Sequence, residues 1–280
     1  MSGALYVVST PIGNLGDITR RAAETLGAAD RIVAEDTRRT RALLSHLGIG
    51  GKPVAKLDAH AGERTLEELV TALEGGESIA LVTDAGTPSV SDPGTDLVRL
   101  AAARGVTVIA IPGPSAVTAA VAVSGLVDGP FLFLGFPPRK GEKRRRLIRR
   151  IATSREPVVL FEAPNRIRET LADLAEVAPA RAACVARELT KLHEELTRGT
   201  LAELARRDVM ERGEFTVVVA GNDEPDEADD ADVDSLVAAR LDSGDSARTI
   251  ADDVAEVSGR PRREIYARVL ELRRARGDDV

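Results

Sequence analysis

The sequence predicts an α/β protein, because short β-branched runs alternate with helical stretches over the first 220 of its 280 residues. The helical stretches keep their apolar residues on one stripe, as Leu66, Leu69, Val70 and Leu73 do within Thr65–Glu74. This alternation favours helices on both faces of a sheet. The predicted strands are Leu5–Val8, Arg31–Ala34, Val54–Leu57, Ile79–Thr83, Val106–Ile111, Phe131–Leu134, Val158–Phe161, Ala183–Ala186 and Thr216–Ala220.

Breaks in this alternation predict the domain organisation. Two prolines and a glycine at residues 112–114 indicate a boundary between an N-terminal α/β domain, residues 1–112, and a second α/β domain, residues 113–222. Residues 223–234 contain eight acids and no base, with too little apolar surface to fold, which is typical of a solvated linker. Residues 235–280 then form a small helical tail.

The tail is predicted to contain two helices joined by a short turn, which resembles a helix-turn-helix. Ser246 suits the N-cap of the first helix, Gly259 closes it, and Pro261 suits the first turn of the second helix. The apolar stripes are Ile250, Val254 and Val257 in the first helix and Ile265, Val269 and Leu272 in the second. Arginines at the start of the second helix favour contact with nucleic acid, and a simple packing or dimerisation hairpin is an equal alternative.

Composition limits the compartment and the metal chemistry. Hydrophobic residues make up 43% of the chain and charged residues 30%, which is enough for real cores under a soluble surface. The longest apolar runs are far shorter than the roughly 20 residues of a membrane span, and no signal-peptide pattern opens the chain. A single cysteine, Cys184, excludes an internal disulfide, and no spacing of His or Cys indicates a metal site. We therefore expect a cytoplasmic protein without a bound metal.

Charge is segregated along the chain. Without the acidic segment 223–234, the net charge of −7 falls to nearly neutral. Residues 138–150 contain eight Lys or Arg against one Glu, which predicts contacts to phosphate. The alternative is a solvated amphipathic helix with Leu147, Ile148 and Ile151 facing the core, and both interpretations can hold together. Aromatic residues amount to only 2%, which argues against base stacking as the main mode of nucleic-acid recognition.

Three loops that follow predicted strands are rich in Gly, Pro and small hydroxyl residues: Ser9–Asp17, Thr83–Gly94 and Ile111–Ala116. In an open α/β sheet, ligands bind outside the carboxyl ends of the strands. The first loop is neither a dinucleotide fingerprint nor a P-loop, because it lacks the third glycine and the Gly-Lys-Ser/Thr sequence. The second loop is longer than a routine turn requires. Each loop alone is equally well explained as a tight turn, and the three together favour a pocket.

Several segments carry a family resemblance, in the family's order. They are Leu5–Thr19, Ala34–Arg38, the loop around Asp84, the loop around Pro112, Gly135–Pro138 and Ala186–Lys191. Over residues 4–222 the chain resembles the small-subunit ribosomal RNA cytidine 2'-O-methyltransferases of the tetrapyrrole (corrin/porphyrin) methylase superfamily. Two departures are evident. The family's His-rich stretch ending in His-Asn-Glu is Asp58–Glu63 here, and its Tyr-Glu-Ser-Pro-His-Arg is Phe161–Arg166.

The resemblance implies a two-domain tetrapyrrole-methylase-like fold with a cofactor cleft between the domains, a helix-turn-helix-like tail and a homodimer. It implies S-adenosylmethionine-dependent 2'-O-methylation of a cytidine ribose in 16S ribosomal RNA, with the small ribosomal subunit as partner. Carried over position by position, the cofactor-binding residues are Pro11, Gly13, Asp84, Ala85, Gly86, Thr87, Pro88, Val90, Ser115, Ala116, Phe161, Ala186, Glu214 and Phe215.

Methyl transfer to a hydroxyl requires in-line positioning, which contributes about 7–11 kcal/mol, and a base beside the ribose hydroxyl. The matching motifs offer Glu35, Asp36, Glu188 and Lys191 as catalytic candidates. The carboxylates of Glu35 and Asp36 would equally suit the start of a helix near Thr37. Lys191 would have to be neutral to act as a base, and a contact to RNA phosphate is an equal alternative.

Candidate RNA contacts come from the basic run and from one matching motif. They are Arg139, Lys140, Lys143, Arg144, Arg145, Arg146 and Arg187. His60 is expected near the substrate cleft or simply at the surface. Two other functions remain as alternatives. A corrin or porphyrin C-methyltransferase is disfavoured by the basic run and the tail, and a non-catalytic ribosome-binding protein would not bind S-adenosylmethionine.

Overall fold

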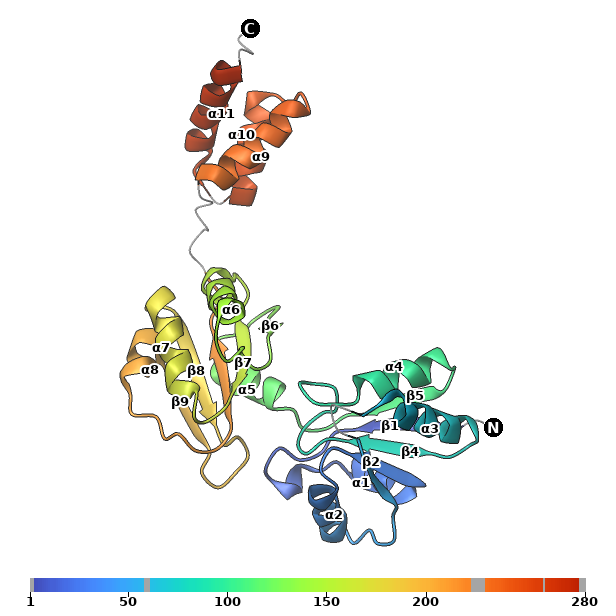
Figure 1. The fold of residues 1–280 in the computed structure, drawn as a ribbon. Coiled ribbons are helices and arrows are strands. Elements are labelled where there is room, and N and C mark those ends of the chain that lie inside the picture. The colour runs from blue at the N-terminus through green and yellow to red at the C-terminus, as the bar shows by residue number, and fades with distance from the viewer. Residues whose placement is uncertain (1–2, 58–60, 223–229, 259, 277–280) are drawn as a thin grey trace. The chain divides into compact units, whose positions relative to one another are not determined.

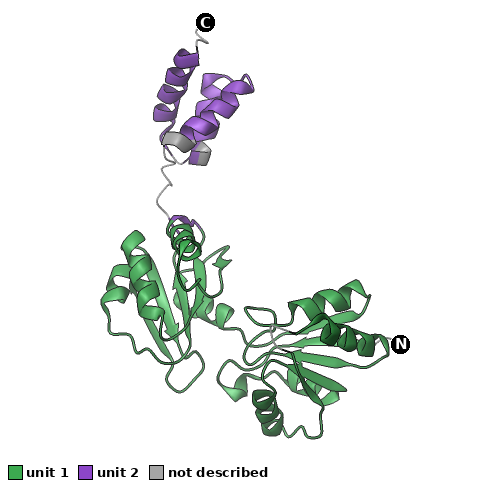
Figure 2. Cartoon of the chain, viewed as in Figure 1, with its two compact units in different colours: residues 1–152, 156–220 green, residues 153–155, 221–280 purple. Residues whose placement is uncertain are grey.

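The computed structural model describes residues 3–57, 61–222, 230–258 and 260–276 (Figure 1). The chain divides into two compact units (Figure 2). Unit 1 comprises residues 1–152 and 156–220, and unit 2 comprises residues 153–155 and 221–280. The predicted α/β class is confirmed, with two five-stranded sheets in unit 1 and helices alone in the described part of unit 2. The predicted boundary near Pro112 falls between the two sheets, inside unit 1.

The first sheet is parallel throughout, with strand order β3-β2-β4-β1-β5. Its strands are β1 (Ala4–Val8), β2 (Arg31–Ala34), β3 (Val54–Lys56), β4 (Ile79–Val82) and β5 (Thr107–Ile111). Parallel strands need crossover connections, which here are helices. Each strand lies within one residue of its predicted ends.

Helices cover both faces of this sheet (Figure 1). Helices α1 (Arg20–Ala28) and α2 (Thr37–His46) pack on one face, and α3 (Glu63–Glu74) and α4 (Thr95–Ala103) pack on the other. Strands β1 and β4 are neighbours, but the helices that follow them lie on opposite faces. This point is the topological switch of the sheet, where open α/β folds bind their ligands.

The second sheet is mixed, with order β6-β7-β10-β8-β9. Its strands are β6 (Leu132–Phe133), β7 (Val158–Glu162), β8 (Ala182–Arg187), β9 (Glu195–Thr200) and β10 (Phe215–Val219). Only β6 and β7 are parallel. Helix α5 (Ala116–Ser124) packs on one face, and α6 (Glu142–Thr153), α7 (Ile167–Val177) and α8 (Leu201–Arg206) pack on the other.

Strand β9 was not predicted from the sequence. Its residues read Glu-Leu-Thr-Arg-Gly-Thr, and none of them is buried. It pairs antiparallel with β8 alone, at the edge of the sheet. Backbone hydrogen bonds therefore define this strand, and edge strands tolerate polar side chains that hide them from an apolar pattern.

The described part of unit 2 contains three helices rather than the predicted two: α9 (Asp230–Asp242), α10 (Ala247–Ser258) and α11 (Arg262–Arg276). Ser246 caps α10 as predicted, by accepting a hydrogen bond from Thr249 N at 3.1 Å. The predicted linker, residues 223–234, extends too far toward the C-terminus, because α9 already begins at Asp230. Val233 and Val237 are buried there against the other two helices. Gly259 lies outside the described residues.

No helix in the described part of the chain is both long enough and apolar enough to cross a membrane.

Candidate active site

The loops after β1 and β4 are bound to each other at the switch point of the first sheet. Thr10 N donates to Gly86 O at 2.8 Å, and Gly86 N donates to Thr10 O at 3.0 Å. The hydroxyls of Ser9 and Thr87 lie 2.9 Å apart. Gly86 has a φ of +79°, which favours glycine, and a Cβ there would meet Ile12 at 3.4 Å. Two of the three predicted ligand loops thus form one rigid wall.

This wall borders a cavity of about 370 Å³ within unit 1. The predicted cofactor residues that line it are Asp84, Ala85, Gly86, Thr87, Val90, Ser115, Ala116, Phe161, Glu214 and Phe215. The resemblance also places Gly213, another lining residue, near the cofactor. Lining residues that the sequence analysis missed are Ile12, Arg39, Ser91, Asp92, Phe136, Glu162, Ala163, Pro164 and Thr216. Most of the missed residues adjoin the quoted motifs, so proximity to a motif was the signal that could have found them.

Four predicted cofactor residues do not line this cavity. Pro88 and Ala186 are buried and do not line the cavity, so their contact with the cofactor stays a prediction. Pro11 lines a neighbouring cavity of about 240 Å³. Gly13 lies against Lys191, where a Cβ would come within 2.4 Å of the lysine Cγ, so packing is what requires a glycine there.

The carboxylates of Glu35, Asp84 and Asp92 lie near one another beside the cavity. Thr83 Oγ1 donates to Glu35 Oε2 at 3.3 Å, and Thr83 also shares a hydrogen bond with Asp92. The pKa of Asp92 is raised to about 6, mainly by burial and also by the charges of Glu35 and Asp84, while the hydrogen bond to Thr83 opposes the rise. Asp92 lines the cavity, whereas Glu35 does not. A carboxylate with this pKa is suited to accept a proton near neutral pH.

Asp36 is a helix cap. Its Oδ1 accepts a hydrogen bond from Arg38 N at 2.8 Å at the start of α2, and its Oδ2 lies 3.0 Å from Arg38 Nη2. These hydrogen bonds lower the pKa of Asp36 to about 2, so it is a very weak base. Its backbone N–H donates to Asp84 Oδ1 at 2.9 Å, which orients the Asp84 carboxylate. The predicted catalytic role of Asp36 gives way to the alternative of a helix cap.

Lys191 remains a cation. Its Nζ lies 2.7 Å from Glu188 Oε1 and 3.1 Å from Glu214 Oε2. Burial lowers the pKa of Lys191, but the hydrogen bonds to both glutamates outweigh burial and raise it overall. These ion pairs disfavour the neutral amine, so the structure favours Lys191 as a cation over its predicted role as a base. The lysine instead binds together the two acidic residues beside the cavity.

The loop after β8 is held in an uncommon backbone conformation. Glu188 and Thr190 have φ values of +53° and +67°, and Asn14 N donates to Thr190 Oγ1 at 3.1 Å. Ser89 and Ser91, in the loop after β4, are also left-handed. Non-glycine residues in this region cost about 1–3 kcal/mol each and cluster at functional sites. Ser91 lines the 370 Å³ cavity, which supports its assignment as the functional site, whereas Glu188 and Thr190 do not line it.

The structure divides the predicted RNA-binding residues. Arg139, Lys140, Lys143, Arg145 and Arg146 are exposed. Arg144 is buried, with its Nε 2.7 Å from Asp173 Oδ2 and its Nη2 3.1 Å from Thr170 Oγ1, so it is withdrawn from the phosphate-binding set. The spacing of Arg144, Ile148 and Ile151 at i, i+4 and i+7 was the signal for this burial.

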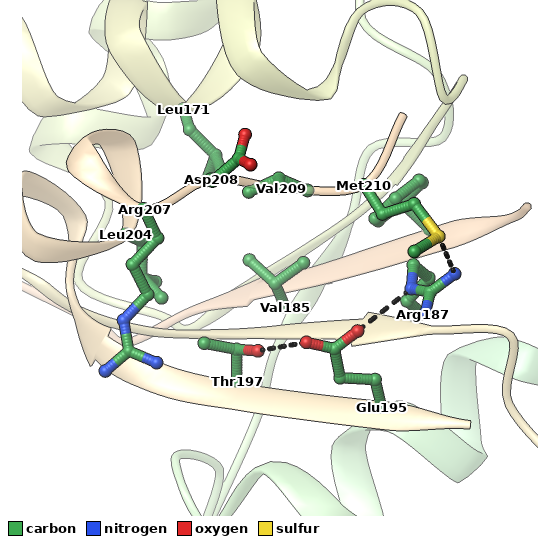
Figure 3. Close-up of a pocket in the computed structure, with 11 residues that line it drawn as sticks. Leu171, Val185, Arg187, Glu195, Thr197, Leu204, Arg207, Asp208, Val209 and Met210 are labelled. Atoms are coloured by element: carbon green, nitrogen blue, oxygen red, sulfur yellow. Dashed lines mark hydrogen bonds and ion pairs between the residues drawn. The ribbon is translucent and has the colours of Figure 1, made fainter. Parts of the chain in front are cut away.

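Arg187 lines a separate cavity of about 350 Å³ (Figure 3). Its Nε lies 3.0 Å from Glu195 Oε2, and its Nη1 lies 3.5 Å from the sulfur of Met210. Only 12% of its side chain is exposed, which disfavours it as a phosphate contact. His60 lies outside the described residues, so its expected place near the substrate cleft stays a prediction. Among the described residues, no three His, Cys, Asp or Glu side chains converge to hold a metal ion.

Comparison with known proteins identifies the family of the chain. Residues 4–205 match the family model described as Tetrapyrrole (Corrin/Porphyrin) Methylases. A protein of Xylella fastidiosa named Ribosomal RNA small subunit methyltransferase I is 43% identical, over 94% of this chain and 98% of that protein. Proteins with the same name are 42% identical in Mycobacterium tuberculosis, over 99% and 98% of the two chains, and 44% identical in Thermotoga maritima, over 79% and 100%.

Solved structures confirm the fold. The methyltransferase CobJ superposes with a TM-score of 0.59 at 19% identity, over 79% of this chain and 95% of that chain. Diphthine synthase superposes with a TM-score of 0.60 at 19% identity, over 78% and 90%. The family model and the curated relatives together define the chain as an α/β methyltransferase. The chain belongs to the tetrapyrrole methylase family, as the resemblance predicted, and its cofactor is S-adenosylmethionine.

Proposed function

We propose that this protein methylates the 2'-oxygen of a cytidine ribose in 16S ribosomal RNA of the small ribosomal subunit. The observation that supports it best is 42–43% identity, over nearly the whole of both chains, to proteins named Ribosomal RNA small subunit methyltransferase I. We further propose that it acts in the cytoplasm as a homodimer, as the family resemblance implies.

The 370 Å³ cavity is proposed as the cofactor site. Its volume falls within the roughly 300–1,000 Å³ range of small-molecule sites. Ile12, Val90 and Phe161 offer apolar walls for a purine, and Asp84 and Glu214 offer acceptors for a ribose diol or an ammonium. Ser115 begins α5 and makes no cap hydrogen bond of its own. The donor set therefore fits S-adenosylmethionine, which supplies a methyl group already activated on a sulfonium.

The protein's part in the reaction is positioning and removal of one proton. We assign Asp92 as the base that accepts this proton. Its carboxylate lines the cofactor cavity, and its pKa of about 6 leaves it largely ionised at neutral pH. Glu35 and Thr83 lie behind it: Glu35 keeps the pKa of Asp92 raised through its charge, and Thr83 holds the carboxylate in place. The ribose hydroxyl would give its proton to Asp92 as its oxygen bonds to the methyl carbon. The bond between that carbon and the sulfonium sulfur would break at the same time, and its electron pair would stay on the sulfur, which leaves as a neutral thioether.

The exposed cations at the start of α6 are proposed to bind RNA phosphate. Lys140, Lys143, Arg145 and Arg146 are all exposed, and Arg145 pairs with Glu142 at 2.9 Å on the surface. Such pairs are weak in water, so phosphate can compete for the arginine. Affinity for RNA should therefore fall steeply as salt concentration rises.

A labelling experiment tests the proposed function. Labelled methyl donor is supplied with small ribosomal subunits, with free ribosomal RNA or with a precorrin, and the labelled product is then hydrolysed in alkali. We expect label in the RNA and an alkali-resistant linkage, because a methylated 2'-oxygen cannot attack the adjacent phosphate. Label in the precorrin, or labelled RNA without a resistant linkage, would contradict ribose methylation.

Substitution of Asp84 tests the cofactor site. Asp84→Asn keeps an acceptor for Asp36 N but removes the charge beside Arg39, whose Nη1 lies 3.4 Å from Asp84 Oδ2. We expect the Kd for S-adenosylmethionine to rise about 10-fold, since a hydrogen bond to a charged group contributes roughly 1.5–3 kcal/mol. Calorimetry measures the Kd, and Asp96→Asn, an exposed acid of α4, serves as the matched control. An unchanged Kd would remove Asp84 from the site.

A further inference from the structure

A larger cavity of about 720 Å³ adjoins the proposed cofactor site. Phe136 and Ala163 line both cavities, so the two share a wall. The larger cavity is further lined by Arg139, Asn165 and Arg166. An acceptor held here would lie next to the methyl donor, and none of the roles assigned so far uses this space.

Phe136 forms an aromatic platform between the two cavities. The residue is 54% exposed, and its ring centroid lies 5.5 Å from that of Phe161. Phe161 is packed in turn against Phe133 at 4.9 Å. Gly135 turns the chain just before the platform, with a φ of +64° that favours glycine. The ring of Phe136 is thus supported from the protein side while much of it faces water.

Two guanidinium groups accompany this platform. Arg166 Nη2 donates to the carbonyls of Pro137 and Pro138 at 2.8 and 3.1 Å, so its guanidinium is fixed in place. Its buried Nε makes no hydrogen bond within the described chain and lies 3.6 Å from Glu162 Oε1. The described residues also provide no hydrogen bond or ion pair to the side chains of Arg139 and Asn165. The carboxylate among the lining residues, Glu169, lies 4.0 Å from Arg144.

We propose that this cavity holds the target nucleotide, with its base stacked on Phe136 and a flanking phosphate on Arg139. The inference rests on the proposed function, because a nucleotide held in this cavity would have its ribose next to the proposed site of the methyl donor. Single-stranded bases are recognised by stacking on aromatic rings and by polar contacts to their edges, which Asn165 and Arg166 can make. The low aromatic content of the chain does not oppose this, since one well-placed ring is enough for one base.

Binding of short RNA tests the platform without methyl transfer. The probes are a labelled oligocytidylate of about eight nucleotides and an abasic strand of the same length, compared by fluorescence anisotropy. We expect the wild type to bind the base-bearing strand about 10-fold more tightly, since stacking of one base contributes roughly 5- to 150-fold. Phe136→Leu should abolish this preference, and Phe136→Trp should restore it.

The arginine is tested with the same two strands. Arg139→Gln should weaken binding of both strands. It should also reduce the slope of log affinity against log salt concentration by about one, because one phosphate contact is lost. Arg21→Gln, an exposed arginine of α1, should leave both affinities unchanged.

Two results would overturn the proposal. One is equal affinity of the wild type for the two strands. The other is a rise in the Kd for S-adenosylmethionine in Phe136→Leu that matches its loss of RNA affinity, because the ring would then be only a wall of the cofactor site. Failure of the proposed function would appear elsewhere, as the absence of an alkali-resistant linkage in RNA treated with the wild type.

Discussion

Asp92→Asn should lower kcat for RNA methylation by about 100-fold or more, because removal of a positioned general base costs roughly 10²–10⁴-fold. In the wild type, the rate should also fall tenfold for each pH unit below about 6, where Asp92 becomes protonated. The variant should lose this acid limb. Single-turnover labelling across a pH series measures both effects.

Glu35→Gln is the matched comparison, because Glu35 shares Thr83 with Asp92 but does not line the cavity. Its charge raises the pKa of Asp92, so its removal should move the acid limb to lower pH and spare the maximum rate. Asp92→Asn that keeps both the wild-type rate and the acid limb would exclude Asp92 as the base.

Folding of the Asp92 variant can be predicted from the same pKa. The folded-state pKa is raised above the ordinary value of 3.8, so the folded protein loses stability as pH rises from about 4 to about 6. Above that range the wild type carries the full cost of a partly buried charge. Asp92→Asn should therefore melt at the same temperature as the wild type or higher at pH 7.5, and a lost rate would then reflect lost chemistry.

Arg144→Met should lower the melting temperature of unit 1 by about 6–12 °C, although Arg144 does not line the proposed cofactor cavity. The guanidinium is 6% exposed and binds Asp173, Thr170 and the carbonyl of Pro138. Breaking a buried pair costs about 3–5 kcal/mol, and we expect the lower end because Asp173 is 33% exposed. Scanning calorimetry of the full chain measures the change.

The neighbouring arginine supplies the control. Arg145→Gln removes a residue that is 70% exposed on the side chain and pairs with Glu142 only at the surface, so its melting temperature should change by about 1–2 °C at most. Its RNA affinity should fall, whereas its affinity for S-adenosylmethionine should not. Equal destabilisation by the two substitutions would contradict the division of the basic run into a structural arginine and surface cations.

The parts of this fold that could be predicted from the sequence are those that follow from the pattern of apolar and polar residues within short segments. Apolar runs such as Ile79–Val82 are buried along their whole length, so they stand out against the polar loops around them. The loop Thr83–Gly94 is identified in the same way, by its length and composition after such a strand. Asp84 and Gly86 can therefore be assigned to the site from the sequence alone.

The rest depended on contacts between residues distant in the sequence. Nothing in the local sequence distinguishes Asp92 and Lys191 from other acids and bases. Only their neighbours in the structure raise the pKa of the Asp92 carboxylate and favour the charged form of Lys191. The acidic start of α9 likewise becomes helical because Val233 and Val237 are buried against α10 and α11. Charge pattern alone predicted a linker there.

The sequence by itself determined the α/β class, nine of the ten strands, the loops that form the site and the family, because these follow from residue order along short segments. Only the tertiary structure decided which arginine of the basic run is buried, that β9 completes the second sheet, and that Phe136 lies between two cavities. Burial, ion pairing and edge-strand hydrogen bonds are made with partners tens of residues away, and those partners set the charge state and exposure of each side chain.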